Sequence, residues 1–209
     1  MKRQKMTAAL LSLVVLVAMS SVHAGDVDAE HGFYTKSTDM VEALSGKKNL
    51  GKKRSLFGGG DEATRSLKLK KKVAVMQMDE QSGKYAETVY ETGHELGNAN
   101  LKVEFDFNSA NIRNESYPLL KELAQALKDN ALAQNQITIA GHTDDVGDDA
   151  YNMQLSIERA QAVKKYLVTE YGVSSSKLKV LGFGETMPVI TNNSKQNRQL
   201  NRRVEILSK

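Results

Sequence analysis

The chain has 209 residues, of which 40% are hydrophobic and 26% are charged, as in ordinary soluble proteins. The formal net charge is +4 at pH 7, but residues 1–24 carry three basic side chains and no acidic one. The remainder therefore carries +1, which argues against nucleic acid as a partner. With no cysteine, we expect neither disulfide bonds nor lipid attachment through an N-terminal cysteine.

Residues 1–24 have the pattern of a secretory signal peptide. A basic start, with Lys2, Arg3 and Lys5, precedes an apolar run at residues 8–18 that is too short to span a bilayer. Val22 and Ala24 place small residues where a signal peptidase needs them. We therefore predict cleavage after Ala24 and export of the mature protein.

Residues 25–97 are weakly patterned and are predicted to be an N-terminal region or linker. A short helix at 40–44, a short strand at 73–78 and a helix within 83–97 are the elements we expect there. Two basic clusters flank a run of three glycines at 58–60. Such clusters indicate a solvated segment or contact with an anionic envelope polymer or lipid.

A regular pattern begins near residue 98 and continues to residue 209. Alternation predicts a strand at 101–107, and Asn114 or Ser116 would start a helix with Pro118 in its first turn. Gly172 is expected to end a second helix. Further predicted segments are strands at 137–140, 178–183 and 202–206, and a polar connection at 188–200. The order β-α-β-α-β-β predicts a two-layer α/β sandwich with its helices on one sheet face.

Two charged residues in the central strand–turn–helix lie where solvent-facing side chains are not expected. Asp144 follows the buried strand at 137–140, and ligands often bind just beyond the carboxyl ends of such strands. On a helical wheel, Arg159 falls in the middle of the apolar face, where a guanidinium needs a partner. The spacing allows an Asp144–Arg159 ion pair. It equally allows a split pair that binds an ammonium at Asp144 and a carboxylate at Arg159.

Five segments in order resemble the OmpA-like peptidoglycan-binding domain family. They are FDFNSA, GHTDDVG, YNMQLSIERAQAVKKYL, GFGETMP and NRQLNRRVEI, and the match covers residues 102–207. The first 95 residues resemble neither the membrane barrel of the large outer-membrane members nor the lipid-modified leader of the peptidoglycan-associated lipoproteins. The connection before NRRVE departs from the family's usual Gly-Arg and reads Asn197-Arg198, which bears on loop shape.

The resemblance implies non-covalent binding of the wall's peptide stem through meso-diaminopimelate. Asp144 is then expected to take the amine and Arg159 the carboxylate, with Arg202 either contacting the ligand or holding the last strand. The other expected contacts are Phe107, Asn108, Ser109, Ala110, Thr143, Asn152 and Leu155. Such a protein would be periplasmic, or peripheral to the outer membrane, in a Gram-negative-type envelope.

Several alternatives remain. His142, Asp144, Asp145, Asp148 and Asp149 fit neither zinc nor EF-hand spacing, so no metal and no cofactor is expected. A wall hydrolase lacks a recognisable nucleophile or base, so we do not expect an enzyme. The domain could instead anchor a flagellar or Tol-type machine whose envelope protein binds residues 25–97. A homo-oligomer would strengthen wall binding through avidity.

Overall fold

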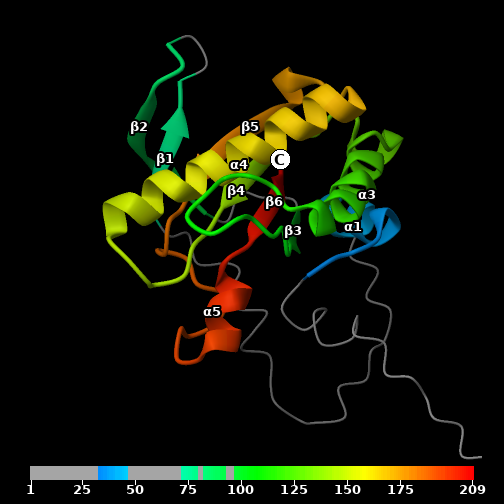
Figure 1. The fold of residues 1–209 in the computed structure, drawn as a ribbon. Helices are drawn as coiled ribbons and strands as arrows, with labels where there is room; N and C mark the ends of the chain where they lie inside the picture. The colour runs from blue at the N-terminus through cyan, green and yellow to red at the C-terminus, as the bar shows by residue number, and fades with distance from the viewer. Residues whose placement is uncertain (1–32, 47–71, 80–81, 93–96) are drawn as a thin grey trace, which may run out of the picture.

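The computed structural model describes residues 33–46, 72–79, 82–92 and 97–209 (Figure 1). The predicted signal peptide, the glycine run and nearly all of the two basic clusters lie outside these ranges. None of the helices described is both long and apolar enough to cross a membrane.

The described strands form one six-stranded sheet in the order β2-β1-β5-β4-β6-β3 (Figure 1). Only the β4–β5 pair is parallel among the strand pairs described, and it lies at the centre of the sheet. The strands are β1 (Lys72–Met78), β2 (Tyr85–Glu91), β3 (Gly97–Leu101), β4 (Ile137–Gly141), β5 (Leu178–Gly182) and β6 (Val204–Ser208).

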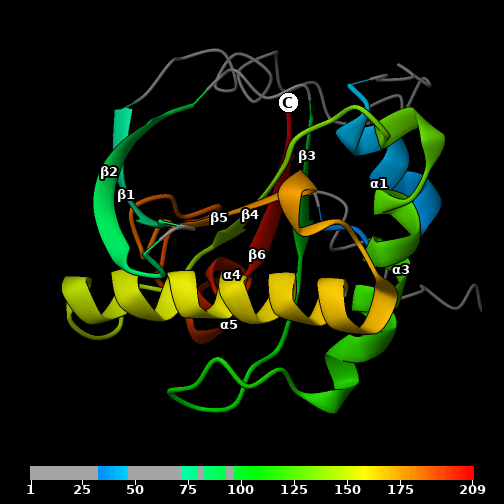
Figure 2. The same ribbon diagram turned by 90° about the horizontal axis from the view of Figure 1, so that it is seen from above.

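Three helices, α1, α3 and α4, form a second layer against one face of this sheet (Figure 2), whereas α5 lies beyond the strand ends (Figure 1). The long helix α4 crosses β4 and β5, and α3 packs between α4 and α1. The described α-helices are α1 (Ser37–Leu44), α3 (Tyr117–Leu127), α4 (Asp149–Tyr171) and α5 (Lys195–Asn201). Short 3-10 turns are η3 (Asn114–Ser116), η4 (Asn130–Leu132) and η5 (Ser175–Lys177). The predicted α/β sandwich is therefore confirmed.

Alternation along the strands separates two apolar clusters on opposite sides of the sheet. Ile139 pairs with Val180 and Ile206, and all three belong to the large cluster beneath the helices. The neighbouring Ala140 pairs with Leu181, and both belong to the smaller cluster on the other side. Because β4 is buried along its whole length, the side chains that follow it are held at the rim of a rigid core.

Three predictions of secondary structure are corrected. The helix expected within 83–97 is wrong, because residues 85–91 form β2 by pairing with β1. The strand expected at 101–107 pairs with β6 only up to Leu101, and beyond it Phe105 forms an isolated bridge with Ile112 across a loop. The polar connection at 188–200 contains α5, which begins after Ser194, whose side chain accepts a bond from Asn197 N.

Parts of the predicted linker region contribute to the sheet and to the core. β1 pairs with β5, and α1 buries Met40 and Leu44 completely in the large cluster. Residues of the segment before α1 also contact β3, since Phe33 forms a bridge with Asn100. The described segments before residue 97 therefore fold together with the rest of the sheet.

Candidate functional site

The turn that leaves β4 is held by backbone hydrogen bonds on both sides. His142 N donates to Arg203 O at 3.0 Å and Thr143 N donates to Gly184 O at 2.9 Å. Asp144 Oδ1 accepts from Val146 N at 3.2 Å, which curls the turn back toward α4. Asp148 then caps α4 by accepting from Ala150 N at 3.0 Å.

Two glycines let α4 approach the sheet closely at the same turn. A Cβ on Gly141 would lie 1.9 Å from Ser156 O, and one on Gly182 would lie 2.6 Å from Ser156 Oγ. The hydroxyl of Ser156 accepts from Gly184 N at 3.0 Å and donates to Met153 O at 2.7 Å. This contact fixes how far Arg159, one turn later, lies from the end of β4.

Arg159 is a buried cation of the site, with 9% of its surface exposed. Its Nε donates to Ser109 O at 3.1 Å, and its guanidinium carbon lies 5.0 Å from the centre of the Phe105 ring. No carboxylate of a described residue lies within ion-pair distance of it. Burial, and after it the nearby charge of Arg202, lowers the pKa of Arg159, whereas Tyr151 and Asp144 oppose this shift.

Asp144 pairs with Arg202 and not with Arg159. Its Oδ2 accepts a hydrogen bond from Arg202 Nη1, which comes from the residue that ends α5. The side chain of Asp144 is 11% exposed and that of Arg202 is 41% exposed. The ion-pair interpretation thus holds for the aspartate with a different arginine, and Arg159 keeps no carboxylate partner among the described residues.

Asn152 ties the turn to α4 and to a neighbouring loop. Its Nδ2 lies 3.3 Å from Asp144 O, 3.3 Å from Val146 O and 2.8 Å from Glu185 Oε2. The residue is 3% exposed, so these acceptors are shielded from competing water. Asn152 therefore fixes the backbone that carries Asp144.

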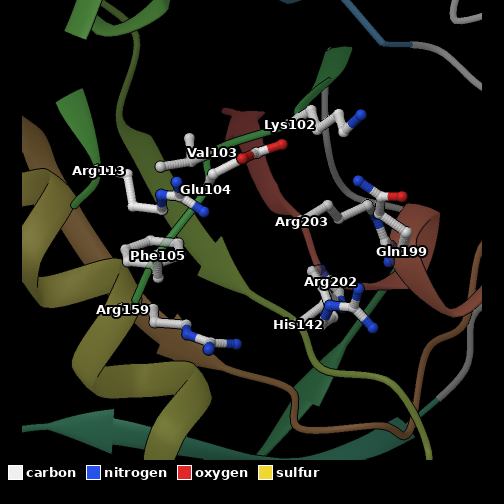
Figure 3. A pocket seen from close by; sticks show the side chains of 10 residues that line it. All are labelled: Lys102, Val103, Glu104, Phe105, Arg113, His142, Arg159, Gln199, Arg202 and Arg203. Atoms are coloured by element: carbon white, nitrogen blue, oxygen red, sulfur yellow. The ribbon is translucent and has the colours of Figure 1, made fainter. Parts of the chain in front are cut away.

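A cavity of about 230 Å³ opens beside these residues (Figure 3). Phe105 lies between Arg113 and Arg159 on one side, and Arg202 lies next to His142 on the other. The lining residues are Lys102, Val103, Glu104, Phe105, Arg113, His142, Arg159, Gln199, Arg202 and Arg203. With five Lys and Arg side chains and one carboxylate in this lining, the cavity suits a ligand that presents an anionic group.

A buried ionic network supports the back of the cavity. Glu205 receives hydrogen bonds from His142 Nε2 at 3.2 Å and Asn98 Nδ2 at 2.9 Å, and it lies 3.5 Å from Arg203. Burial, and after it the charge of Arg203, lowers the pKa of His142 to about 4. Burial alone would raise the pKa of Glu205, but His142 and Arg203 lower it to about 2. Glu205 is therefore ionised and His142 neutral at pH 7.

The part of the chain with this turn and cavity has relatives of known family. The OmpA family model matches residues 104–202. Residues 104–202 are an OmpA family domain. The resemblance seen in the five sequence segments is thereby confirmed.

Two curated proteins illustrate the relatives of this OmpA family domain. Outer membrane porin F of Pseudomonas aeruginosa is 42% identical over 111 residues, which cover 53% of this chain and 31% of the porin. Peptidoglycan-associated lipoprotein of Pseudomonas putida is 39% identical over 102 residues, which cover 49% of this chain and 59% of the lipoprotein. The chain thus spans less than two thirds of the length of either relative.

A solved structure similar to this chain is the peptidoglycan-associated lipoprotein from Burkholderia pseudomallei. The sequence identity is 32% and the TM-score is 0.46, with 51% of this chain and 88% of the other chain covered.

The predicted site residues occupy four segments of the OmpA family domain, namely the turn after β4, the helix α4, the loop after residue 105 and the end of α5. Asp144 and Thr143 follow β4, while Asn152, Leu155 and Arg159 share α4. Thr143 and Leu155 are buried, and no described residue hydrogen-bonds to Thr143 Oγ1.

The loop after residue 105 approaches the same place from the other side. Ser109 contributes its carbonyl oxygen to Arg159, and Asn108 has the positive φ of 47° that lets the loop turn. Ala110 is half-buried in this loop. Phe107 is 93% exposed, so its side chain does not continue the buried alternation that the sequence indicated.

Several residues of the cavity were missed by sequence reasoning. Phe105 was assigned to the strand core, although its ring lies under the Arg159 guanidinium. Arg113, Lys102 and Gln199 also line the cavity, although none of them is among the predicted site residues. Arg203 lies next to Arg202 in the last predicted strand and lines the same cavity, but it was not among the predicted site residues.

The acidic turn is used for capping and pairing. Asp148 caps α4, Asp144 pairs with Arg202, and His142 bonds to Glu205. Within the described ranges, no group of three or more His, Asp or Glu side chains has an arrangement that could hold a metal ion.

Proposed function

We propose that this protein binds peptidoglycan non-covalently through the meso-diaminopimelate of the peptide stem. The side-chain end of this residue carries an ammonium and a carboxylate on one carbon. Asp144 would receive the ammonium and Arg159 the carboxylate. The observation that carries the proposal is the buried guanidinium of Arg159, which faces a cavity without a carboxylate partner among the described residues.

The physical support is the cost of leaving a buried charge uncompensated. A guanidinium that is 9% exposed loses most of its hydration and regains little from one carbonyl oxygen and an aromatic face. A carboxylate that binds its planar edge bidentately would restore that loss. Lys, which has no planar edge, would not serve equally well.

The relatives' names agree with this chemistry, since one curated relative is a peptidoglycan-associated lipoprotein. We infer a location in the periplasm, or peripheral to the outer membrane, of a Gram-negative cell. There the protein would tether the outer membrane or an envelope complex to the wall. We propose no catalytic step, because the residues of the cavity supply charge for binding and no activated nucleophile.

The test is co-sedimentation of the protein with purified sacculi, with free meso-diaminopimelate as competitor. The full chain is used, because α1 and β1 belong to the same core and sheet as the site. Wild type is expected to pellet and to be released by the competitor. Asp144→Asn and Arg159→Gln are expected to stay in the supernatant while keeping a cooperative melting transition.

Asp149→Asn is the matched control. It removes a charge from the first turn of α4 but does not line the cavity. This variant should pellet like wild type. The proposal is wrong if wild type stays in the supernatant, or if folded Asp144→Asn and Arg159→Gln still pellet and are still released by the competitor.

A further inference from the structure

We infer that Arg202 makes the site selective for a ligand that carries both charges, because it neutralises Asp144 until a ligand ammonium replaces it. This inference rests on the proposed function and assigns Arg202 a role beyond contacting the ligand or holding β6. It predicts that the site rejects a simple amine, such as a lysine side chain. The reason lies in which charges each ligand leaves uncompensated.

The first observation is that the proposed ammonium position already has a cation. Arg202 Nη1 donates to Asp144 Oδ2, and no other cation of the described residues pairs with this carboxylate. A charged donor on a carboxylate that is only 11% exposed is a strong competitor for an incoming amine. An ammonium therefore exchanges with Arg202 and does not fill an unpaired site.

The second observation is that Arg202 can leave while the fold stays intact. Its side chain is 41% exposed and projects from the residue that ends α5. Its backbone N–H bonds to Arg198 O, so the helix end does not depend on the guanidinium. Arg203, in contrast, is 6% exposed and bonds to Asn100, so the neighbouring arginine is the one that anchors the strand.

The third observation is that Arg159 lies within the electrostatic reach of the same two groups. Arg202 acts on it unfavourably and Asp144 favourably. Both arginines line the same cavity (Figure 3). Once Arg202 is released, two guanidinium groups therefore share the cavity, and neither has an ion-pair partner among the described residues. The ligand ammonium has taken Asp144, and Glu104 in the lining pairs with neither arginine.

The two kinds of ligand now differ in their final charge balance. An amine alone exchanges one cation for another at Asp144 and leaves both arginines uncompensated, which is unfavourable in a partly buried cavity. A zwitterionic end brings a carboxylate that Arg159 and the released Arg202 can share. Selectivity then comes from a penalty on the wrong ligand as well as from contacts to the right one.

The experiment compares two synthetic tripeptides that differ in one carboxylate. In L-Ala-γ-D-Glu-meso-diaminopimelate, the side chain of the third residue ends in an ammonium and a carboxylate. In L-Ala-γ-D-Glu-L-Lys, the side chain of the third residue ends in an ammonium alone. Isothermal titration of each into the full chain gives the ratio of the two dissociation constants. Wild type is expected to prefer the first peptide by about tenfold or more, the value of one charged hydrogen bond.

Arg202→Gln is expected to bring this ratio toward one, mainly because binding of the lysine peptide becomes tighter. Arg113→Gln is the control for cavity charge. It removes one positive charge from the same lining, and its side chain bonds to Glu115 and not to Asp144. It should change the ratio much less than Arg202→Gln does.

Each of the following outcomes would overturn the inference. If Arg202→Gln weakens both peptides equally, Arg202 is a plain ligand contact. If Arg113→Gln lowers the ratio as much as Arg202→Gln, the total positive charge of the cavity sets the selectivity, and the pairing of Arg202 with Asp144 does not. If wild type binds neither peptide, the proposed function fails and this inference fails with it, whereas an unchanged ratio in Arg202→Gln defeats the inference alone.

Discussion

Gly141→Ala is expected to push α4 away from β4 and so to separate the two halves of the site. The added Cβ would lie 1.9 Å from Ser156 O, whereas real Cβ contacts essentially never fall under 3.0 Å. The obstructing atom is backbone, so the helix itself must move by about 1.1 Å. The 3.1 Å bond from Arg159 Nε to Ser109 O would then lose its geometry.

Overpacking of this kind costs about 1–3 kcal/mol of unfolding free energy, and the entropic gain of replacing glycine returns less than about 1 kcal/mol. Urea unfolding followed by circular dichroism measures the net loss. Sacculus co-sedimentation of the folded variant measures binding, which should fall strongly because the guanidinium is displaced relative to Asp144. Unchanged stability together with unchanged binding would refute this reasoning.

Gly97→Ala provides a matched comparison. Its Cβ would lie 1.8 Å from Ala43 O, so it should push α1 away from β3 with a similar loss of stability. Because α4 is not displaced, binding to sacculi should persist. Equal loss of binding in both variants would mean that destabilisation, and not the position of α4, explains the effect.

Three further predictions concern stability. Because the pKa of His142 falls from 6.5 to about 4 on folding, the unfolded chain binds more protons between these values. Stability should therefore drop by about 3 kcal/mol as the pH falls from 6.5 to 4, and His142→Gln should flatten this urea-measured slope. Asn152→Ala should cost about 1–3 kcal/mol, because buried acceptors lose their donor, and should speed hydrogen exchange at Val146. Ser116→Ala leaves Glu104 N without its 2.7 Å partner and should lower the melting temperature.

Each of these has its own contrary result. A pH slope that persists in His142→Gln would assign it to another group. Normal exchange at Val146 in Asn152→Ala would mean that Asn152 does not hold the turn. For Ser116, the comparison is Ser109→Ala, whose hydroxyl bonds to Asn111 N in an exposed loop. An equal fall of the melting temperature in both variants would mean that the loss of the Ser116 hydrogen bond costs no more than the loss of an exposed one.

Local patterns predicted the central elements because local and tertiary preferences agree there. Apolar spacing and Gly172, with φ of 64° at its end, predicted α4. The strand at 137–140 was found because β4 is flanked by strands on both sides and buried along its length. In such segments the local pattern and the tertiary packing favour the same conformation, so a short stretch of sequence is enough to predict it.

Where the sequence misled, pairing across long distances decides the structure. Residues 85–91 are mostly exposed, so their pattern has no apolar stripe, and only hydrogen bonding to β1 makes them a strand. In the candidate site, Asp144 and Arg159 are predicted from expected burial and strand position. The pairing of Asp144 with Arg202 could not be predicted from the sequence, because the position of Arg202 depends on α5 and on the register of β6.

If the protein acts as the wall tether proposed above, the position of the candidate site at the end of β4 has a mechanical consequence. β4 is paired over five residue positions with β5 on one side and five with β6 on the other. A pull applied to the turn after β4, along the strand axis, loads both rows of hydrogen bonds in shear, so that many bonds must fail together. The force therefore acts first on β4, which has hydrogen-bonded neighbours on both sides. Resistance to such a pull is governed by the unfolding rate under force.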